Sequence, residues 1–212
     1  MGDGKATVRK KLEEERAVAV LRGDEPERVF EIATTLVKGG VRVLEVTMTV
    51  PGAFDLIRRL AEEIDALVGA GSVRTMEDVD HCVEAGARFI VSPACVPSMI
   101  RRAVERDILV IPGAMTPTEI LTAWNLGADM VKVFPAARLG PSFLTDVHGP
   151  LPEIPLVPTG GLTGDNAGEY LASGATLVCF GSWLTQCDRA QMLHRARAIR
   201  ALIESHRKGA RD

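Results

Sequence analysis

Residues 36–48 read LVKGGVRVLEVTM, and the order of features within this stretch decides the fold. An amphipathic segment ends at a glycine, and an apolar run follows at once. The same order recurs at three further glycines, so that Gly40, Gly86, Gly127 and Gly174 are successively 46, 41 and 47 residues apart. Glycine is favoured just after a helix because it adopts the left-handed backbone there. Each interval has room for two strand–helix units, and the pattern predicts parallel strands that alternate with helices.

Short apolar runs alternate with amphipathic segments along the whole chain. Together they predict a single (β/α)8 barrel over residues 1–212, with a short, exposed, charged helix before the first strand. A doubly wound open sheet is the alternative. The expected strands are 17–21, 41–48, 66–70, 88–91, 108–111, 130–134, 155–157 and 176–180. The expected helices are 26–38, 53–63, 75–84, 96–106, 117–125, 165–172 and 189–205.

The composition narrows the class of protein. Hydrophobic residues make up 46% and charged residues 25% of the 212 residues, which excludes intrinsic disorder. A net charge of −3 predicts neither a nucleic-acid partner nor a membrane-surface partner. No apolar run approaches the roughly 20 residues that span a bilayer. The cysteines show no CxxC pair and no zinc-finger spacing, so we expect free thiols, no metal and a cytoplasmic location.

Two ionisable residues interrupt apolar strands. Glu45 lies in VRVLEVTM and Lys132 in DMVKVFP. Counting five residues on from each of the four glycines gives Glu45, Val91, Lys132 and Cys179, which we expect to form one layer of interior side chains near the carboxyl ends of the strands. An unpaired charge in a core costs several kcal/mol. The two residues therefore either form a buried ion pair or take part in chemistry.

The use of lysine favours chemistry over a structural ion pair. The other lysines lie in the terminal segments or at a helix end: Lys5, Lys10, Lys11, Lys38 and Lys208. Elsewhere the chain uses arginine, which cannot lose its proton at neutral pH, whereas a desolvated lysine can. A lysine within a strand therefore indicates that a neutral amine is needed. Such an amine attacks a carbonyl to form a Schiff base, and a nearby carboxylate can then transfer protons.

Candidate binding residues lie where the expected strands end, because barrel active sites form at the carboxyl ends of strands. The turns PTGG at 158–161 and GS at 181–182 predict a phosphate site built from backbone N–H groups, with a simple tight turn as the alternative for PTGG. Arg22 is suited to hold a carboxylate or phosphate, or else caps a strand at the surface. Both tryptophans, Trp124 and Trp183, are expected to pack. The full set of strand-end candidates is Arg22, Thr47, Ser72, Pro93, Phe134, Thr159, Gly160, Gly161, Gly181 and Ser182.

Taken together, the motifs resemble those of the KDPG/KHG aldolase family, which acts on 2-keto-3-deoxy-6-phosphogluconate (KDPG) and 4-hydroxy-2-oxoglutarate (KHG). The motifs are VAVLRG, GGVRVLEVTMTVPGA, GAGSV, FIVSPA, PGAMTPTE, VKVFPA, GPSFL, PTGG and FGSW, and they cover nearly the whole chain in order. The resemblance implies a (β/α)8 barrel, a homotrimer, and a class I aldolase that needs neither a metal nor an organic cofactor. Some members carry Arg where this chain has Thr49, which leaves Arg22 as the candidate for holding the substrate anion.

The resemblance also implies a role for particular residues. Lys132 is implied to be the Schiff-base lysine, and Glu45 the carboxylate that transfers protons. The implied reactions are cleavage of KDPG to pyruvate and glyceraldehyde 3-phosphate, and of KHG to pyruvate and glyoxylate; the sequence does not choose between them. Substrate contacts are implied for Arg22, Ser72, Pro93, Phe134, Thr159, Gly160, Gly161, Gly181 and Ser182. Two other classes stay open: a phosphate-binding isomerase or synthase without a Schiff base, and a non-catalytic barrel that binds a phosphorylated metabolite.

Overall fold

Strands and helices alternate along the chain as predicted, and every strand pairing is parallel. The structure is a computed structural model that describes residues 4–209, so the two ends of the predicted span 1–212 lie outside the described residues. The strands are β1 (Ala17–Leu21), β2 (Val43–Thr47), β3 (Leu67–Gly71), β4 (Phe89–Val91), β5 (Leu109–Ile111), β6 (Gly113–Ala114), β7 (Val131–Val133), β8 (Leu156–Pro158) and β9 (Val178–Phe180). The helices are α1 (Lys5–Glu15), α2 (Pro26–Lys38), α3 (Ala53–Glu63), α4 (Met76–Glu84), α5 (Pro97–Glu105), α6 (Pro117–Asn125), α7 (Ala136–Leu139), α8 (Ser142–His148), α9 (Ala167–Ala172), α10 (Ser182–Thr185) and α11 (Arg189–Gly209).

The glycine that follows α2 ends the helix in the way the sequence predicts. Gly40 has a φ of +94°, in the left-handed region. The next residue, Val41, donates its backbone N–H to the carbonyl of Leu36 at 3.0 Å, which closes the last turn. The other three glycines of the repeat have φ values between +94° and +95°. The repeat therefore marks helix ends, as predicted.

The strands form two sheets, and the prediction of one closed eight-stranded barrel is wrong. The larger sheet has six strands in the order β5-β4-β3-β2-β1-β9, and the smaller has three in the order β6-β7-β8. The fifth predicted strand, 108–111, is observed as β5 (Leu109–Ile111). After Pro112, which has no N–H to donate to a neighbouring strand, the chain enters the smaller sheet as β6 (Gly113–Ala114). At the boundary between β8 and β9, where the two sheets also meet, an isolated bridge between Thr159 and Cys179 replaces a continuous ladder of hydrogen bonds.

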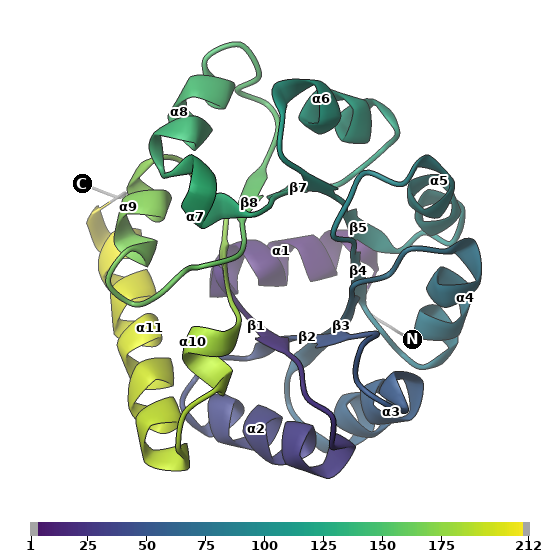
Figure 1. Cartoon of the computed structure of the whole chain (residues 1–212), viewed down its shortest axis with the longest axis vertical. Helices are drawn as coiled ribbons and strands as arrows, with labels where there is room; N and C mark the ends of the chain where they lie inside the picture. The colour runs from purple at the N-terminus through teal and green to yellow at the C-terminus, as the bar shows by residue number, and fades with distance from the viewer. Residues whose placement is uncertain (1–3, 210–212) are drawn as a thin grey trace.

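Both sheets surround one interior, and the helices lie around them except for α1, which crosses the centre of the view (Figure 1). This arrangement also differs from the open-sheet alternative, in which helices cover both faces of the sheet. Two backbone hydrogen bonds join the chain around Pro112 to the segment that contains β7. Asp129 N donates to Val110 O at 3.0 Å, and Lys132 N donates to Pro112 O at 2.9 Å. Glu45, on β2, and Lys132, on β7, therefore belong to different sheets.

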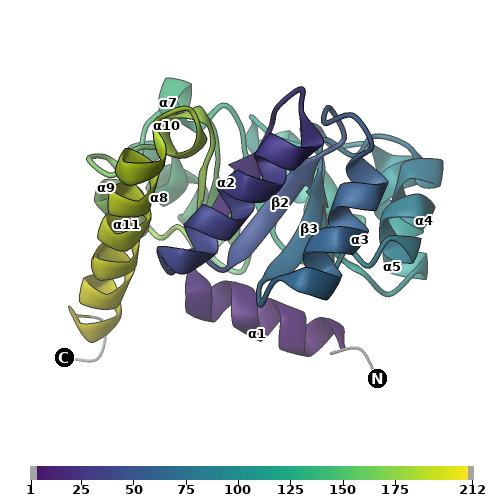
Figure 2. The ribbon, with the colours of Figure 1, turned by 90° about the horizontal axis from the view of Figure 1, so that it is seen from below.

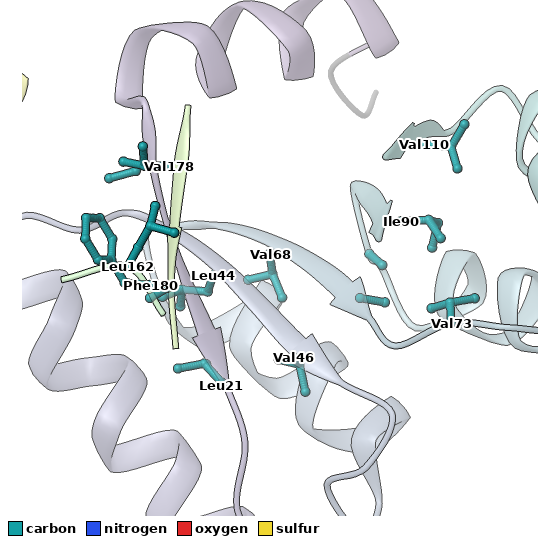
Figure 3. Packing of buried hydrophobic residues seen from close by; sticks show 14 of the residues in the cluster. Leu21, Leu44, Val46, Val68, Val73, Ile90, Val110, Leu162, Val178 and Phe180 are labelled. Atoms are coloured by element: carbon teal, nitrogen blue, oxygen red, sulfur yellow. The ribbon is translucent and has the colours of Figure 1, made fainter. Parts of the chain in front are cut away.

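Buried apolar side chains form two separate clusters, because successive residues of a strand point to opposite faces. In β1, Val18 and Val20 belong to the inner cluster, inside the sheets, whereas Ala19 and Leu21 belong to the outer cluster, between strands and helices. Figure 3 shows part of the outer cluster, in which Leu21 and Phe180 are labelled. The residues of each strand that do not face the helices thus face a common interior.

Helix α1 closes one end of this interior. The sequence predicts an exposed helix here, which is wrong for one face: Val8 and Leu12 are only 3% and 1% exposed and belong to the inner cluster. Figure 2 shows α1 crossing the molecule at this end. Burying a leucine side chain contributes about 1.5–3 kcal/mol. Helix α1 therefore seals the interior rather than merely leading into β1.

The carboxyl ends of the strands lie at the opposite end of the molecule, because all the strands run parallel. Helices α7 and α10, which follow β7 and β9, are found at this end in Figure 2. Among residues 4–209, no helix combines the length and apolar character that crossing a membrane requires.

Candidate active site

A cavity of about 170 Å³ opens at the carboxyl ends of the strands. Most of the candidates predicted from the sequence line it: Arg22, Pro93, Lys132, Phe134, Thr159, Gly160, Gly161, Gly181 and Ser182. Glu45, Thr47 and Ser72 are not among the lining residues. The sequence analysis missed four residues that do line the cavity: Val20, Leu162, Thr163 and Trp183. The structure therefore brings the residues of widely separated motifs into one site.

Lys132 lies at the centre of the three-stranded sheet. It is in register with Gly113 of β6 and Val157 of β8, and it is 4% exposed. Its Nζ atom lies 5.4 Å from the centre of the Phe134 ring, which stands at the mouth of the cavity and is 39% exposed. Gly113, beside Lys132 in the sheet, lets the backbone of Pro93 approach closely, because a Cβ at Gly113 would collide with it. The amine is thus buried but reaches the cavity.

Glu45 is completely buried, and both of its carboxylate oxygens lack a hydrogen-bond partner among the described residues. Its side chain lies against Gly71 of the neighbouring strand, where a Cβ would be only 2.6 Å from Glu45 Cδ. A buried polar group without a partner costs about 1–3 kcal/mol, and more when it is charged. A free-energy cost of this size at the centre of a strand indicates that the Glu45 carboxylate is kept for function rather than for stability.

The predicted layer of interior side chains is present. Val91 and Cys179 belong to the inner cluster, and Cys179 is close enough to Glu45 and Lys132 to respond to both charges. The pKa of the Cys179 thiol is raised to about 12, first by burial and then by the negative charge of Glu45, against the opposing effects of Thr159 and Lys132. Cys179 is therefore an uncharged thiol beside two ionisable groups.

Arg22 faces the cavity next to Ser72. Its guanidinium donates to the Ser72 hydroxyl at 3.4 Å, and Ser72 has a φ of +60°, which is uncommon for a residue with a side chain. Thr47 is placed differently, because its hydroxyl donates to Leu21 O at 3.0 Å and shares a 2.8 Å hydrogen bond with Thr49. Thr47 thus links β2 to β1, whereas Arg22 lines the cavity and contacts Ser72 beside it.

Two glycine-containing turns line the cavity, one through Gly160 and Gly161 and the other through Gly181 and Ser182. Gly160 and Gly161 have φ values of +94° and +79°, so the turn requires glycine at both positions. The backbone N–H groups of Gly161 and Ser182 donate to no other residue within the described part of the chain. Such groups are suited to bind an anion.

Trp183 packs, as predicted, but it also lines the cavity. Its ring centre lies 5.8 Å from that of Phe180, and the Arg195 guanidinium lies 4.8 Å from the Trp183 ring centre. Arg195 also donates to the backbone carbonyl of Trp183. No group of three or more His, Cys, Asp or Glu side chains is arranged to hold a metal ion in the part of the chain that the structure describes.

A buried lysine and a buried carboxylate near the carboxyl ends of parallel strands, next to turns suited to bind an anion, are the arrangement expected of an aldolase, a class of lyase. The family model described as KDPG and KHG aldolase matches residues 8–200. The chain belongs to this family of aldolases.

Individual relatives agree with this assignment. The chain is 39% identical over 164 residues to the KHG/KDPG aldolase of Escherichia coli K12, which covers 76% of this chain and 77% of the relative. It is 30% identical to the 2-keto-3-deoxy-6-phosphogluconate aldolase of Zymomonas mobilis ZM4, solved with 3-phosphoglycerate, with a TM-score of 0.85 over 94% of this chain and 97% of that one. It is also 30% identical to the KDPG aldolase of Legionella pneumophila, solved with pyruvate as a covalent carbinolamine, with a TM-score of 0.79 over 93% and 97% of the two chains.

Proposed function

We propose that this protein is a class I aldolase that reversibly cleaves KDPG to pyruvate and glyceraldehyde 3-phosphate, KHG to pyruvate and glyoxylate, or both. One observation carries the proposal: a lysine that is 4% exposed shares the interior with a carboxylate whose two oxygens have no partner among the described residues. The relative from Legionella pneumophila, in which pyruvate is held as a carbinolamine, supports the same chemistry.

Lys132 is the nucleophile in this proposal. Its unprotonated amine attacks the C2 ketone of the 2-oxo acid, and a carbinolamine forms. Loss of water from the carbinolamine gives an iminium that links Lys132 to C2. The iminium supplies the electron acceptor for the later step, so the reaction calls for neither a metal nor an organic cofactor.

Glu45 moves the protons. Directly or through a water molecule, its carboxylate takes the proton from the C4 hydroxyl, the C3–C4 bond breaks, and the electron pair enters the iminium to give an enamine. The aldehyde leaves. Glu45 then returns the proton to C3 of the enamine, and water hydrolyses the new iminium to release pyruvate and the free Lys132 amine. The unpartnered oxygens of Glu45 have no competing donor among the described residues.

In this proposal, Arg22, Ser72 and Thr159 hold the substrate carboxylate. Arg22 takes the role that Arg plays in those members that carry it at the position of Thr49. The phosphate of KDPG binds the backbone N–H groups of Gly161 and Ser182, which donate to no other residue in the described part of the chain. Pro93, Phe134, Gly160 and Gly181 complete the contacts along the cavity. The family resemblance also supports a homotrimer.

Reductive trapping tests this proposal directly. The protein is incubated with pyruvate and borohydride, and the adduct is located by mass spectrometry of peptides. We expect the adduct on Lys132, and we expect Lys132→Ala to lose both the adduct and cleavage of either substrate. Lys38→Ala is the matched control, because Lys38 is exposed at the end of α2. Absence of an adduct on Lys132 in a folded protein would rule out the Schiff base and favour a phosphate-binding isomerase, synthase or non-catalytic protein.

A further inference from the structure

Asn166 lies behind the glycine-rich turn and does not line the cavity. Its side chain makes two hydrogen bonds with that turn: Nδ2 donates to the carbonyl of Gly161 at 3.1 Å, and Oδ1 accepts from the backbone N–H of Thr163 at 2.9 Å. Gly161 and Thr163 both line the cavity. One side chain outside the site therefore fixes two points of the turn that forms its wall.

The bond to Gly161 determines the orientation of a backbone N–H group. In a trans peptide, the C=O and the following N–H lie in one plane and point in opposite directions. Gly160 O accepts from Ala137 N at 3.0 Å, which fixes the direction of the Gly161 N–H. In the same way, Asn166 holds Gly161 O and so fixes the direction of the Leu162 N–H.

The Leu162 N–H is free to serve a ligand. It donates to no other residue in the described part of the chain, and Leu162 lines the cavity. Because Gly161 has a positive φ and no side chain, the turn has no steric restraint of its own at this point. The restraint on the peptide between Gly161 and Leu162 comes from the amide of Asn166.

We propose that Asn166 is a positioning residue that gives the site its preference for a substrate with a terminal phosphate. The inference rests on the proposed aldolase function, since the phosphate is that of KDPG. A residue that only capped the start of α9 would affect stability and would act equally on both substrates. A residue that orients the turn acts on the phosphorylated substrate and leaves the unphosphorylated one unchanged.

The test compares kcat and KM for KDPG and KHG in the wild type and in Asn166→Ala. We expect the KM for KDPG to rise about tenfold, the order expected when one hydrogen-bond donor to an anion is misplaced, while kcat and both constants for KHG change less than about twofold. Asn125→Ala is the matched control, because Asn125 is exposed at the end of α6. Equal effects on the two substrates, or no effect on either, would overturn the inference.

Two further measurements keep the outcome decisive. Asn166→Asp retains the acceptor for the Thr163 N–H and loses the donor to Gly161, so it should show the same split between substrates even if Asn166→Ala does not fold. Titration with inorganic phosphate by calorimetry gives a reading independent of catalysis, and its Kd should weaken about tenfold in Asn166→Ala. If the wild type cleaves neither substrate, the proposed function fails, and the phosphate titration still decides the role of Asn166.

Discussion

Replacing Gly71 by alanine tests whether Glu45 must sit where the structure puts it. A Cβ on Gly71 would lie 2.6 Å from both Cγ and Cδ of Glu45. Nonbonded carbon atoms rest about 3.5–4.0 Å apart, so the carboxylate must move by about 1 Å. Misplacing a catalytic group by about 1 Å costs about 100-fold in rate, or about 2.7 kcal/mol in activation free energy. We expect kcat of Gly71→Ala to fall by about this factor.

The matched control is Gly69→Ala, two residues earlier on the same strand. A Cβ at Gly69, which is in register with Glu45, would lie 2.5 Å from the Phe89 ring, and its three nearest neighbours are all atoms of Phe89 rather than of Glu45. Overpacking of this kind lowers the free energy of unfolding by about 1–3 kcal/mol. Both variants should therefore lose similar stability, and Gly71→Ala alone should lose most of its activity.

The assay follows pyruvate release from saturating KDPG with a coupled dehydrogenase, and urea titration gives the free energy of unfolding. The comparison is made at a temperature where both variants are folded. If Gly71→Ala and Gly69→Ala had kcat values within about threefold of each other, the position of the Glu45 carboxylate would not control the reaction, and the reasoning from Gly71 would be refuted.

Three further outcomes are expected. Glu45→Gln should lower turnover by about 100-fold or more while the borohydride adduct on Lys132 still forms, because proton transfer is lost and the amine is retained; loss of the adduct would contradict this. Leu12→Ala should lower the free energy of unfolding in urea by about 2–5 kcal/mol, because Leu12 is 1% exposed at the closed end of the interior, and a loss below about 1 kcal/mol would show that α1 does not seal it. Burial raises the pKa of the Cys179 thiol from 9.0 to about 12, so the unfolded chain loses this proton at a lower pH than the folded protein does. The stability that the buried neutral thiol contributes is therefore complete below pH 9.0 and is lost as the pH rises toward 12. Urea titrations should therefore show a shallower fall of stability for Cys179→Ala over this range, by up to about 1.4 kcal/mol per pH unit, and parallel curves would exclude the effect.

The alternation of strands and helices could be predicted because its signals are local. A glycine such as Gly40 ends a helix for reasons contained in a few residues of chain, and the apolar run after it forms a strand. The division into two sheets could not be predicted in this way. It depends on which strand lies beside Pro112, whose nitrogen carries no hydrogen to donate, and on how few residues pair between Thr159 and Cys179. Such pairing is a property of the assembled sheet.

The site was predicted where its residues carry unusual chemistry for their position. Lys132 and Glu45 stand out because ionisable groups are rare within apolar strands. Val20 and Leu162 were missed because an apolar residue in a strand or turn looks the same whether it faces the core or a cavity. Asn166 carries no signal either, since asparagine before a helix is ordinary. Its bond to Gly161 becomes visible only when the turn has folded back on itself.

The two sheets also explain why the site depends on the whole interior. Glu45 belongs to the six-stranded sheet and Lys132 to the three-stranded sheet, so no continuous ladder of hydrogen bonds fixes the spacing between them. That spacing is set by the packing of the inner cluster, which Leu12 of α1 closes from below, and by the bridge between Thr159 and Cys179. Cys179, which forms this bridge, is an uncharged thiol and adds no charge between the two groups. The position of Glu45 relative to Lys132 therefore depends on how the two sheets pack against each other as well as on the immediate neighbours of each residue.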